Sequence, residues 1–197
     1  MNRTPTFTAL CLLSSMPVAA AEECAEHTSL AQLEESTERA AAAFGRQDED
    51  DFFRAVVESR SRVECLGEAI APGLAGEVHL TMALATFFDG DREEARRSLQ
   101  AVLLQESDFA LPASLNVVEG DFLYRDLEWA RDLPAPTMRA LDGFESGWLT
   151  VDGRRVNERP ESLPFVLQRF TADGEVRNTA YLLAGAALPE WGVAPEY

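Results

Sequence analysis

The chain has 197 residues, with 17 Arg, no Lys and 34 Asp or Glu, and its formal net charge is −17. Without lysine it lacks the phosphate-binding lysine of P-loop NTPases, the phosphate-pairing lysine of kinases and any Schiff-base lysine, so these enzyme classes are excluded. The acidic balance also argues against nucleic-acid binding, which depends on clustered cationic side chains.

Residues 1–21 have the pattern of a signal peptide. Arg3 precedes an apolar stretch over 7–18, and Ala19-Ala20-Ala21 follows as a small-residue cleavage pattern, with cleavage between Ala21 and Glu22. The apolar stretch is too short to span a bilayer, and no second run of about 18 apolar residues follows it. We therefore expect an exported protein, periplasmic or secreted, that does not insert into a membrane. The alternative is an ordinary N-terminal segment.

Two cysteines remain once the signal segment and Cys11 are removed. An even pair in an exported chain predicts a disulfide between Cys24 and Cys65. Two buried thiols or a redox pair are the alternatives, although the C-x-x-C spacing typical of a redox pair is absent.

Residues 22–136 have the apolar spacing of helices and contain 25 acidic residues against 10 Arg. Capping residues, glycine and proline predict where the helices begin and end. Ser29 begins a helix that Gly45 ends, Asp48 and Asp91 begin two others, and Pro72 stands in the first turn of one between them. A fifth helical segment is expected between 112 and 133. The sequence thus predicts antiparallel helical hairpins.

Four acidic residues in a row begin the second predicted helix: Asp48, Glu49, Asp50 and Asp51. The positive end of a helix favours anions there, so the run has a structural explanation. It is also the candidate acidic contact face for a basic segment of a partner. A similar series, Asp89-x-Asp91-x-Glu93, does not fit a calcium loop, because its sixth and twelfth positions lack the required Gly and Glu.

Residues 42–48 and 85–91 look like copies of one another, since both pass from an apolar helix through a polar turn into a second helix. Around the second copy, Ala83-x-x-x-Phe87-x-x-Gly90-Asp91-x-x-x-Ala95-x-x-x-Leu99 resembles tetratricopeptide-like (TPR-like) repeats. The resemblance covers residues 73–107 well and 29–66 poorly, and it departs from the 34-residue period. It implies a stack of paired helices that binds proteins; a generic stack of helical hairpins is the alternative.

After Pro134-Ala135-Pro136, residues 137–197 have strand-like spacing. One strand is expected over 147–151, followed by an Asp152-Gly153 hairpin turn and a return strand over 154–156. The segment 149–153 resembles the small PEGA-type β domains of envelope proteins.

Two further strands are expected over 163–170 and 176–183, joined by a turn at 172–175. Because so small a sheet is marginal alone, it should pack on the helices, with Trp148, Trp191 or Phe144 at the joint. The fold class predicted for the whole chain is α+β, with the helical part over 22–136 and the β part over 137–197.

The sequence offers little chemistry. His79 lies on a mostly apolar helix and is predicted to be a packing residue, and His27 is expected to be solvated. Neither a G-x-S-x-G elbow nor H-E-x-x-H occurs, and no Gly-rich phosphate loop is found. We therefore predict no catalytic, cofactor-binding or metal-binding residue, no cofactor and no bound nucleotide.

These patterns favour a non-enzymatic protein of the bacterial cell envelope. Its helical hairpins would serve as an interaction or scaffold module for another envelope protein, through a basic segment of that partner. A carboxylate-dependent periplasmic glycan hydrolase is the alternative, because 34 acidic residues allow many carboxylate pairs. A purely structural or solubilising role is the third possibility.

Overall fold

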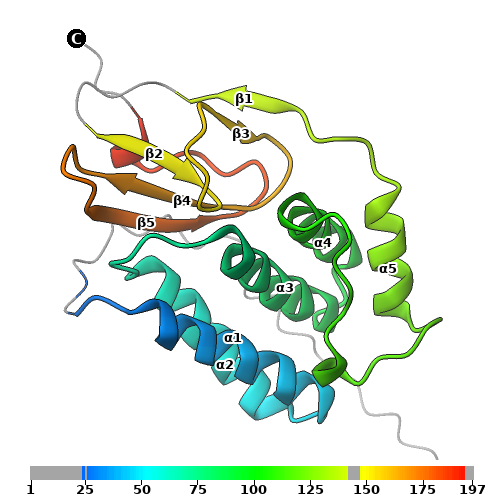
Figure 1. Cartoon of the computed structure of the whole chain (residues 1–197). Helices are drawn as coiled ribbons and strands as arrows, with labels where there is room; N and C mark the ends of the chain where they lie inside the picture. Colours follow the sequence, from blue (N-terminus) through cyan, green and yellow to red (C-terminus); the bar gives the residue numbers. More distant parts are fainter. Residues whose placement is uncertain (1–23, 25, 142–146, 194–197) are drawn as a thin grey trace, which may run out of the picture.

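A computed structural model describes residues 24, 26–141 and 147–193, and over these it confirms the predicted α+β order of helices followed by antiparallel strands (Figure 1). The helices are α1 (Leu30–Gly45), α2 (Glu49–Glu64), α3 (Pro72–Phe88), α4 (Arg92–Gln105) and α5 (Phe122–Arg131), with short 3-10 turns η1 (Ala113–Leu115) and η2 (Glu190–Gly192).

The helices begin where the local signals predicted. Ser29 forms a capping box with Gln32 at the start of α1. The side chains of Asp48 and Asp91 accept backbone N–H groups in the first turns of α2 and α4. Pro72 is the first residue of α3. Each signal lies within four residues of the helix end it sets, which is why the sequence alone located these ends.

The two hairpin turns have the same backbone hydrogen bonds at corresponding positions. Asp48 N–H donates to Ala43 O at 3.0 Å, and Asp91 N–H donates to Thr86 O at the same distance. The residue before each aspartate is left-handed: φ is 58° at Gln47 and 84° at Gly90. The turn is therefore built twice, once with glycine at the left-handed position and once without.

Over the ranges that the structure describes, the strands form two separate sheets. β2 (Trp148–Val151), β4 (Phe165–Phe170) and β5 (Val176–Leu182) make a three-stranded antiparallel sheet in the order β2-β4-β5. β1 (Met138–Ala140) and β3 (Glu158–Pro160) make an antiparallel ribbon. The predicted β4–β5 hairpin is confirmed.

The predicted return strand over 154–156 is wrong. After Asp152-Gly153 only one backbone bridge forms, between Val151 and Arg154, and β2 pairs with β4 instead. The guanidinium of Arg154 donates to the carbonyls of Leu104 and Gln105 at the end of α4, at 3.2 and 3.3 Å. This contact holds residue 154 on α4. The chain after β2 therefore does not pair back with β2 and continues to the ribbon of β1 and β3.

The sheet has a core on each face. Val166 and Tyr181 join the main core of the helices. The other face carries a smaller cluster that includes Leu149, Phe165 and Leu167, against which Trp191 packs. Trp191, one of the three alternatives predicted for the joint with the helices, therefore does not lie there. Trp148 stacks on Phe170 of the same sheet at 5.3 Å, and Phe144 lies outside the described residues.

The predicted disulfide between Cys24 and Cys65 is present and ties the segment before α1 to the end of α2. Thr28 strengthens this attachment, since its N–H donates to Cys65 O and its carbonyl accepts from Gly67 N–H. The predicted signal segment 1–21 and the cleavage point at Ala21 and Glu22 lie outside the described residues. Within the described ranges, no helix is both long and apolar enough to cross a bilayer.

Candidate functional site

The acidic run at the start of α2 is divided between structural and free carboxylates. Asp48 caps the helix, and Asp51 receives two hydrogen bonds from the Arg39 guanidinium, at 2.9 and 2.6 Å. The Arg39 hydrogen bond holds the pKa of Asp51 below its usual value. Glu49 and Asp50 are exposed, and no described residue pairs with them. Of the predicted acidic contact face, these two keep an unbalanced charge.

An aromatic cluster that the sequence patterns did not predict lies about one helical turn beyond these carboxylates on α2 and at the end of α3. The rings of Phe52, Phe53 and Phe88 contact one another, with centroids 5.1 to 5.8 Å apart. Phe52 is buried, but 46% of Phe88 is exposed, and one helical turn beyond Phe53 the side chain of Val57 is 69% exposed. The sequence signal for this cluster was the pair Phe87-Phe88 at the end of α3. Adjacent helical side chains point in different directions, so both cannot enter one core.

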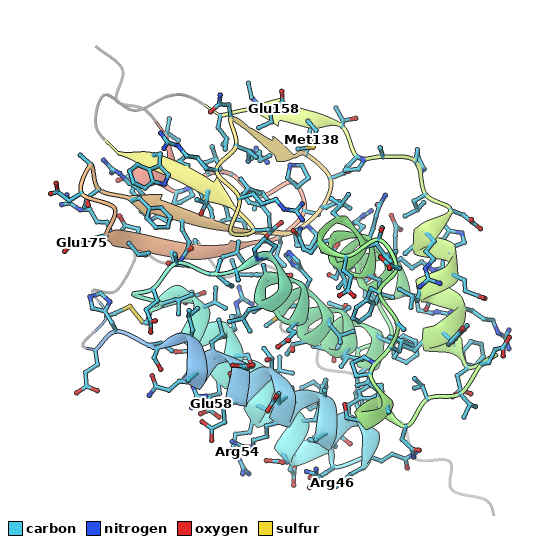
Figure 2. The ribbon with its side chains drawn as sticks, viewed as in Figure 1. Arg46, Arg54, Glu58, Met138, Glu158 and Glu175 are labelled. Carbon is cyan, nitrogen blue, oxygen red and sulfur yellow. A yellow bond between two sulfur atoms is a disulfide. The ribbon has the colours of Figure 1, made fainter. Side chains whose placement is uncertain are left out.

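We call this surface the turn end, defined as Glu49, Asp50, Phe53, Val57 and Phe88. Its residues come from α2 and the end of α3, which the two hairpin turns bring to the same side of the helical part (Figure 1). Arg46 and Arg54 border it and are labelled in Figure 2. Arg46 is 3.2 Å from Asp51, so its charge is partly balanced. The turn end therefore combines exposed apolar surface with free carboxylates.

A second cluster joins the helices to the sheet, and it is buried. His79 Nε2 lies 3.0 Å from Asp152 Oδ1, and its Nδ1 lies 3.3 Å from the Tyr181 hydroxyl. The same carboxylate accepts from Val166 N–H at 2.7 Å and from Gln105 Nε2 at 3.0 Å. His79 is fully buried, which confirms it as a packing residue with satisfied partners.

Burial, and after it the Asp152 carboxylate, strongly raises the pKa of the Tyr181 hydroxyl, so this hydroxyl stays protonated. It can then donate to His79 while His79 donates to Asp152. All three side chains are at least nine-tenths buried, and each of their polar atoms is already hydrogen-bonded within the fold, so none is left to bind a substrate. The cluster therefore acts as a polar joint.

Gln168 of β4 extends this polar joint. Its side-chain carbonyl accepts from Ile70 N–H at 2.9 Å, and its amide donates to Glu68 O at 2.9 Å. Thr179 of β5 donates its hydroxyl to Leu66 O at 3.0 Å. The segment between α2 and α3 thus has backbone groups satisfied by strand side chains, which fixes the sheet on the helices.

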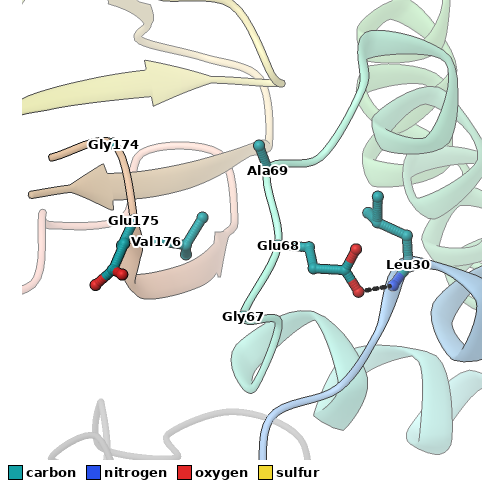
Figure 3. Close-up of a pocket in the computed structure, with 7 residues that line it drawn as sticks. All are labelled: Leu30, Gly67, Glu68, Ala69, Gly174, Glu175 and Val176. Atoms are coloured by element: carbon teal, nitrogen blue, oxygen red, sulfur yellow. Dashed lines mark hydrogen bonds between the residues drawn. The ribbon is translucent and has the colours of Figure 1, made fainter.

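A shallow hollow lies where the start of α1, the loop after α2 and the β4–β5 turn meet (Figure 3). It contains two carboxylates, those of Glu68 and Glu175. Glu68 accepts from Leu30 N–H at 3.1 Å, and Figure 3 shows the two carboxylates pointing away from each other. A glycosidase pair would instead face one another across the bond to be cleaved.

Glu77 on α3 is the described carboxyl group whose surroundings disfavour its charge most clearly. Burial raises its pKa, as do the nearby carboxylates of Glu34 and Glu38, while a hydrogen bond from the Thr37 hydroxyl opposes them. In the described part of the chain, no group of three or more His, Cys, Asp or Glu residues is arranged to hold a metal ion.

Comparisons of this chain with protein-family models, with curated proteins and with solved structures gave no match.

Proposed function

We propose that the protein is a non-enzymatic exported protein of the bacterial cell envelope and that its helical hairpins, of the TPR-like kind, bind another envelope protein at the turn end. Export through a signal peptide and a periplasmic or secreted location belong to this proposal. The Cys24–Cys65 disulfide is compatible with it, because disulfides persist in oxidising compartments.

The observation that carries the proposal is the exposed Phe88 ring in edge contact with Phe53 at 5.1 Å. Large aromatic side chains supply much of the binding energy at protein interfaces when a partner covers them. Val57 extends the apolar surface along α2 by one helical turn.

The carboxylates of the turn end indicate the chemistry of the partner. Glu49 and Asp50 precede Phe53 by about one turn of α2, and they form no ion pair with any described residue. A partner segment with Arg or Lys beside an apolar residue would complement both features. Charge complementarity of this kind mainly raises the association rate and the specificity, and salt weakens it.

The test compares proteins captured from an envelope extract by the disulfide-bonded chain and by its variants. Phe88→Ser should lose the partner, and the double variant Glu49→Gln, Asp50→Asn should retain it less and with a smaller dependence on salt. Leu183→Ser is the matched control, because Leu183 follows β5 and is also 46% exposed. The proposal fails if no protein is captured at low salt or if Phe88→Ser captures the same proteins as the unmodified chain.

A further inference from the structure

Arg159 is a buried cation on the ribbon of β1 and β3. Only 6% of its surface is exposed. Its guanidinium carbon lies 5.5 Å from the ring centroid of Phe165, a fully buried residue of the smaller core on the outer face of the sheet. This places a permanent positive charge against apolar surface.

No carboxylate in the described part of the chain lies within ion-pair distance of this guanidinium. Its Nη1 makes a long hydrogen bond of 3.4 Å to the carbonyl of Pro160, and its buried Nε has no hydrogen-bond partner among the described residues. By contrast, eight arginines of the helical part lie within 4.0 Å of a carboxylate: Arg39, Arg46, Arg54, Arg60, Arg62, Arg92, Arg96 and Arg97.

A second cation stands directly opposite. Arg139 pairs with Arg159 in the register of the ribbon, so the two side chains leave the same face, and Arg139 is exposed. Like charges in this position repel. Burial lowers the pKa of Arg159, the charge of Arg139 lowers it further, and Glu161 opposes both. Glu161 is exposed and follows β3.

A buried charge without a partner is strongly unfavourable, and an unsatisfied buried group in a native protein calls for a specific explanation. The chain has twice as many acidic residues as arginines, so a carboxylate could readily occupy a position next to Arg159. We propose that Arg159 and Arg139 instead form a binding site for one oxyanion, the carboxylate or phosphate group of a ligand that docks on this ribbon.

Guanidinium groups suit this role. Each presents a planar fork of N–H donors that matches two oxygens of a carboxylate or phosphate. Arg159 is fixed by its packing on Phe165, and the exposed Arg139 can close on the ligand from solvent. The ribbon, marked by Met138 and Glu158 in Figure 2, lies far from the Arg46 and Arg54 side chains that border the turn end. The site is therefore independent of the proposed partner surface.

The test titrates the full disulfide-bonded chain with sodium acetate and with sodium phosphate, against sodium chloride at equal ionic strength. The midpoint of thermal unfolding should rise with the bound oxyanion and not with chloride, because a ligand of the folded state stabilises it. The Nε–H signals of Arg159 and Arg139 in a nitrogen–proton NMR spectrum should shift in the same titration. The stronger of acetate and phosphate identifies a carboxylate or a phosphate ligand.

Variants separate the site from general charge effects. Arg159→Met should raise the dissociation constant for the oxyanion at least tenfold, and Arg139→Met should raise it several-fold. Arg177→Met, at an exposed position on β5, is the control and should leave it unchanged.

In chloride alone, Arg159→Met should unfold at the same temperature as the unmodified chain or higher, because an unpaired buried charge is removed. A lower unfolding temperature would mean that the folded chain stabilises Arg159 without a ligand, through a carboxylate of its own or through the packing on Phe165, and it would overturn the proposal. So would NMR signals and unfolding midpoints that respond to acetate and phosphate no differently than to chloride.

Discussion

The two hairpin turns and the polar joint solve the same problem, satisfying polar backbone groups, by opposite means. In the turns, each hydrogen bond connects residues at most five positions apart, as from Asp48 N–H to Ala43 O. In the joint, the bonds that satisfy backbone groups connect residues 98 and 113 positions apart, from Ile70 N–H to the Gln168 side chain and from the Thr179 hydroxyl to Leu66 O. The turns are thus specified locally, whereas the joint forms only when the helices and the sheet meet.

This difference also separates surface from interior. The turns leave Phe88, Glu49 and Asp50 exposed to solvent, on the surface that we propose binds a partner. The joint buries His79 and Asp152, so their hydrogen bonds hold the sheet on the helices. Variants that break one region and spare the other would measure how far the difference extends.

The largest loss of folding stability is expected for Asp152→Ala. This change removes the acceptor for Val166 N–H, Gln105 Nε2 and His79 in a buried place. The free energy of unfolding should fall by about 4 kcal/mol in chemical denaturation. Glu119→Ala, at an exposed loop position, is the control and should change little. A loss below about 1 kcal/mol for Asp152→Ala would show that the joint contributes less than its burial indicates.

A somewhat smaller loss is expected when the disulfide is removed in the double variant Cys24→Ser, Cys65→Ser. The bond closes a loop with a sequence separation of 41 residues, and the chain-entropy model gives about 3 to 4 kcal/mol for such a loop. Each single serine variant should lose nearly as much as the double variant, since either one breaks the bond. Two free thiols in a mass measurement without reductant would contradict the disulfide itself.

Two glycines separate backbone strain from packing. Gly153 and Gly90 both have positive φ, 75° and 84°. A Cβ at Gly153 would lie 2.3 Å from the carbonyl oxygen of Ile70 in the joint, whereas a Cβ at Gly90 would have no described atom within 4 Å. Gly90→Ala should therefore cost about 1 kcal/mol from φ alone, and Gly153→Ala about 3 kcal/mol. Equal losses of stability for the two variants in thermal unfolding would mean that the backbone of the joint shifts at little cost to make room for the Cβ.

The corresponding change in the other hairpin turn should have the opposite sign. Gln47 occupies the left-handed position that Gly90 occupies in the second turn, with φ of 58°. Gln47→Gly relieves this strain but adds freedom to the unfolded chain, so we expect a net gain of about 0.5 kcal/mol. Chemical denaturation of this variant beside Gly90→Ala would check it. A loss for Gln47→Gly would show that the two turns are not equivalent in energy.

The smallest effect is expected for Glu77→Gln, and it depends on pH. Because the pKa of Glu77 is higher in the folded chain, its ionisation opposes folding. Its contribution is most favourable below the pKa of the unfolded chain and is lost as the pH rises through the folded pKa. Glu77→Gln should thus unfold at a higher temperature than the unmodified chain at pH 7, with the difference disappearing near pH 4. Glu128→Gln, at an exposed position on α5, is the control variant. A lower unfolding temperature for Glu77→Gln at pH 7 would contradict the expectation.

The sequence predicted the features whose causes lie within a few residues. Ser29, Asp48 and Asp91 cap the helices as expected, and the β4–β5 hairpin forms at its Asp-Gly turn. The same Asp-Gly signal at 152–153 was misleading, because Arg154 bonds to the end of α4, a contact with no local trace. Neither could the turn end be assembled from sequence, because ring contacts between α2 and α3 create it.

Four features of this protein were set by its sequence alone. These are the absence of lysine, the excess of acidic residues, the order of helices before strands and the pairing of Cys24 with Cys65. The tertiary structure decided which charges are balanced. Asp51 is neutralised by Arg39 from the neighbouring helix, whereas Arg159 lies buried beside Arg139. Composition counts charges, but their effect depends on distance and on exposure to water, and only folding sets those two quantities.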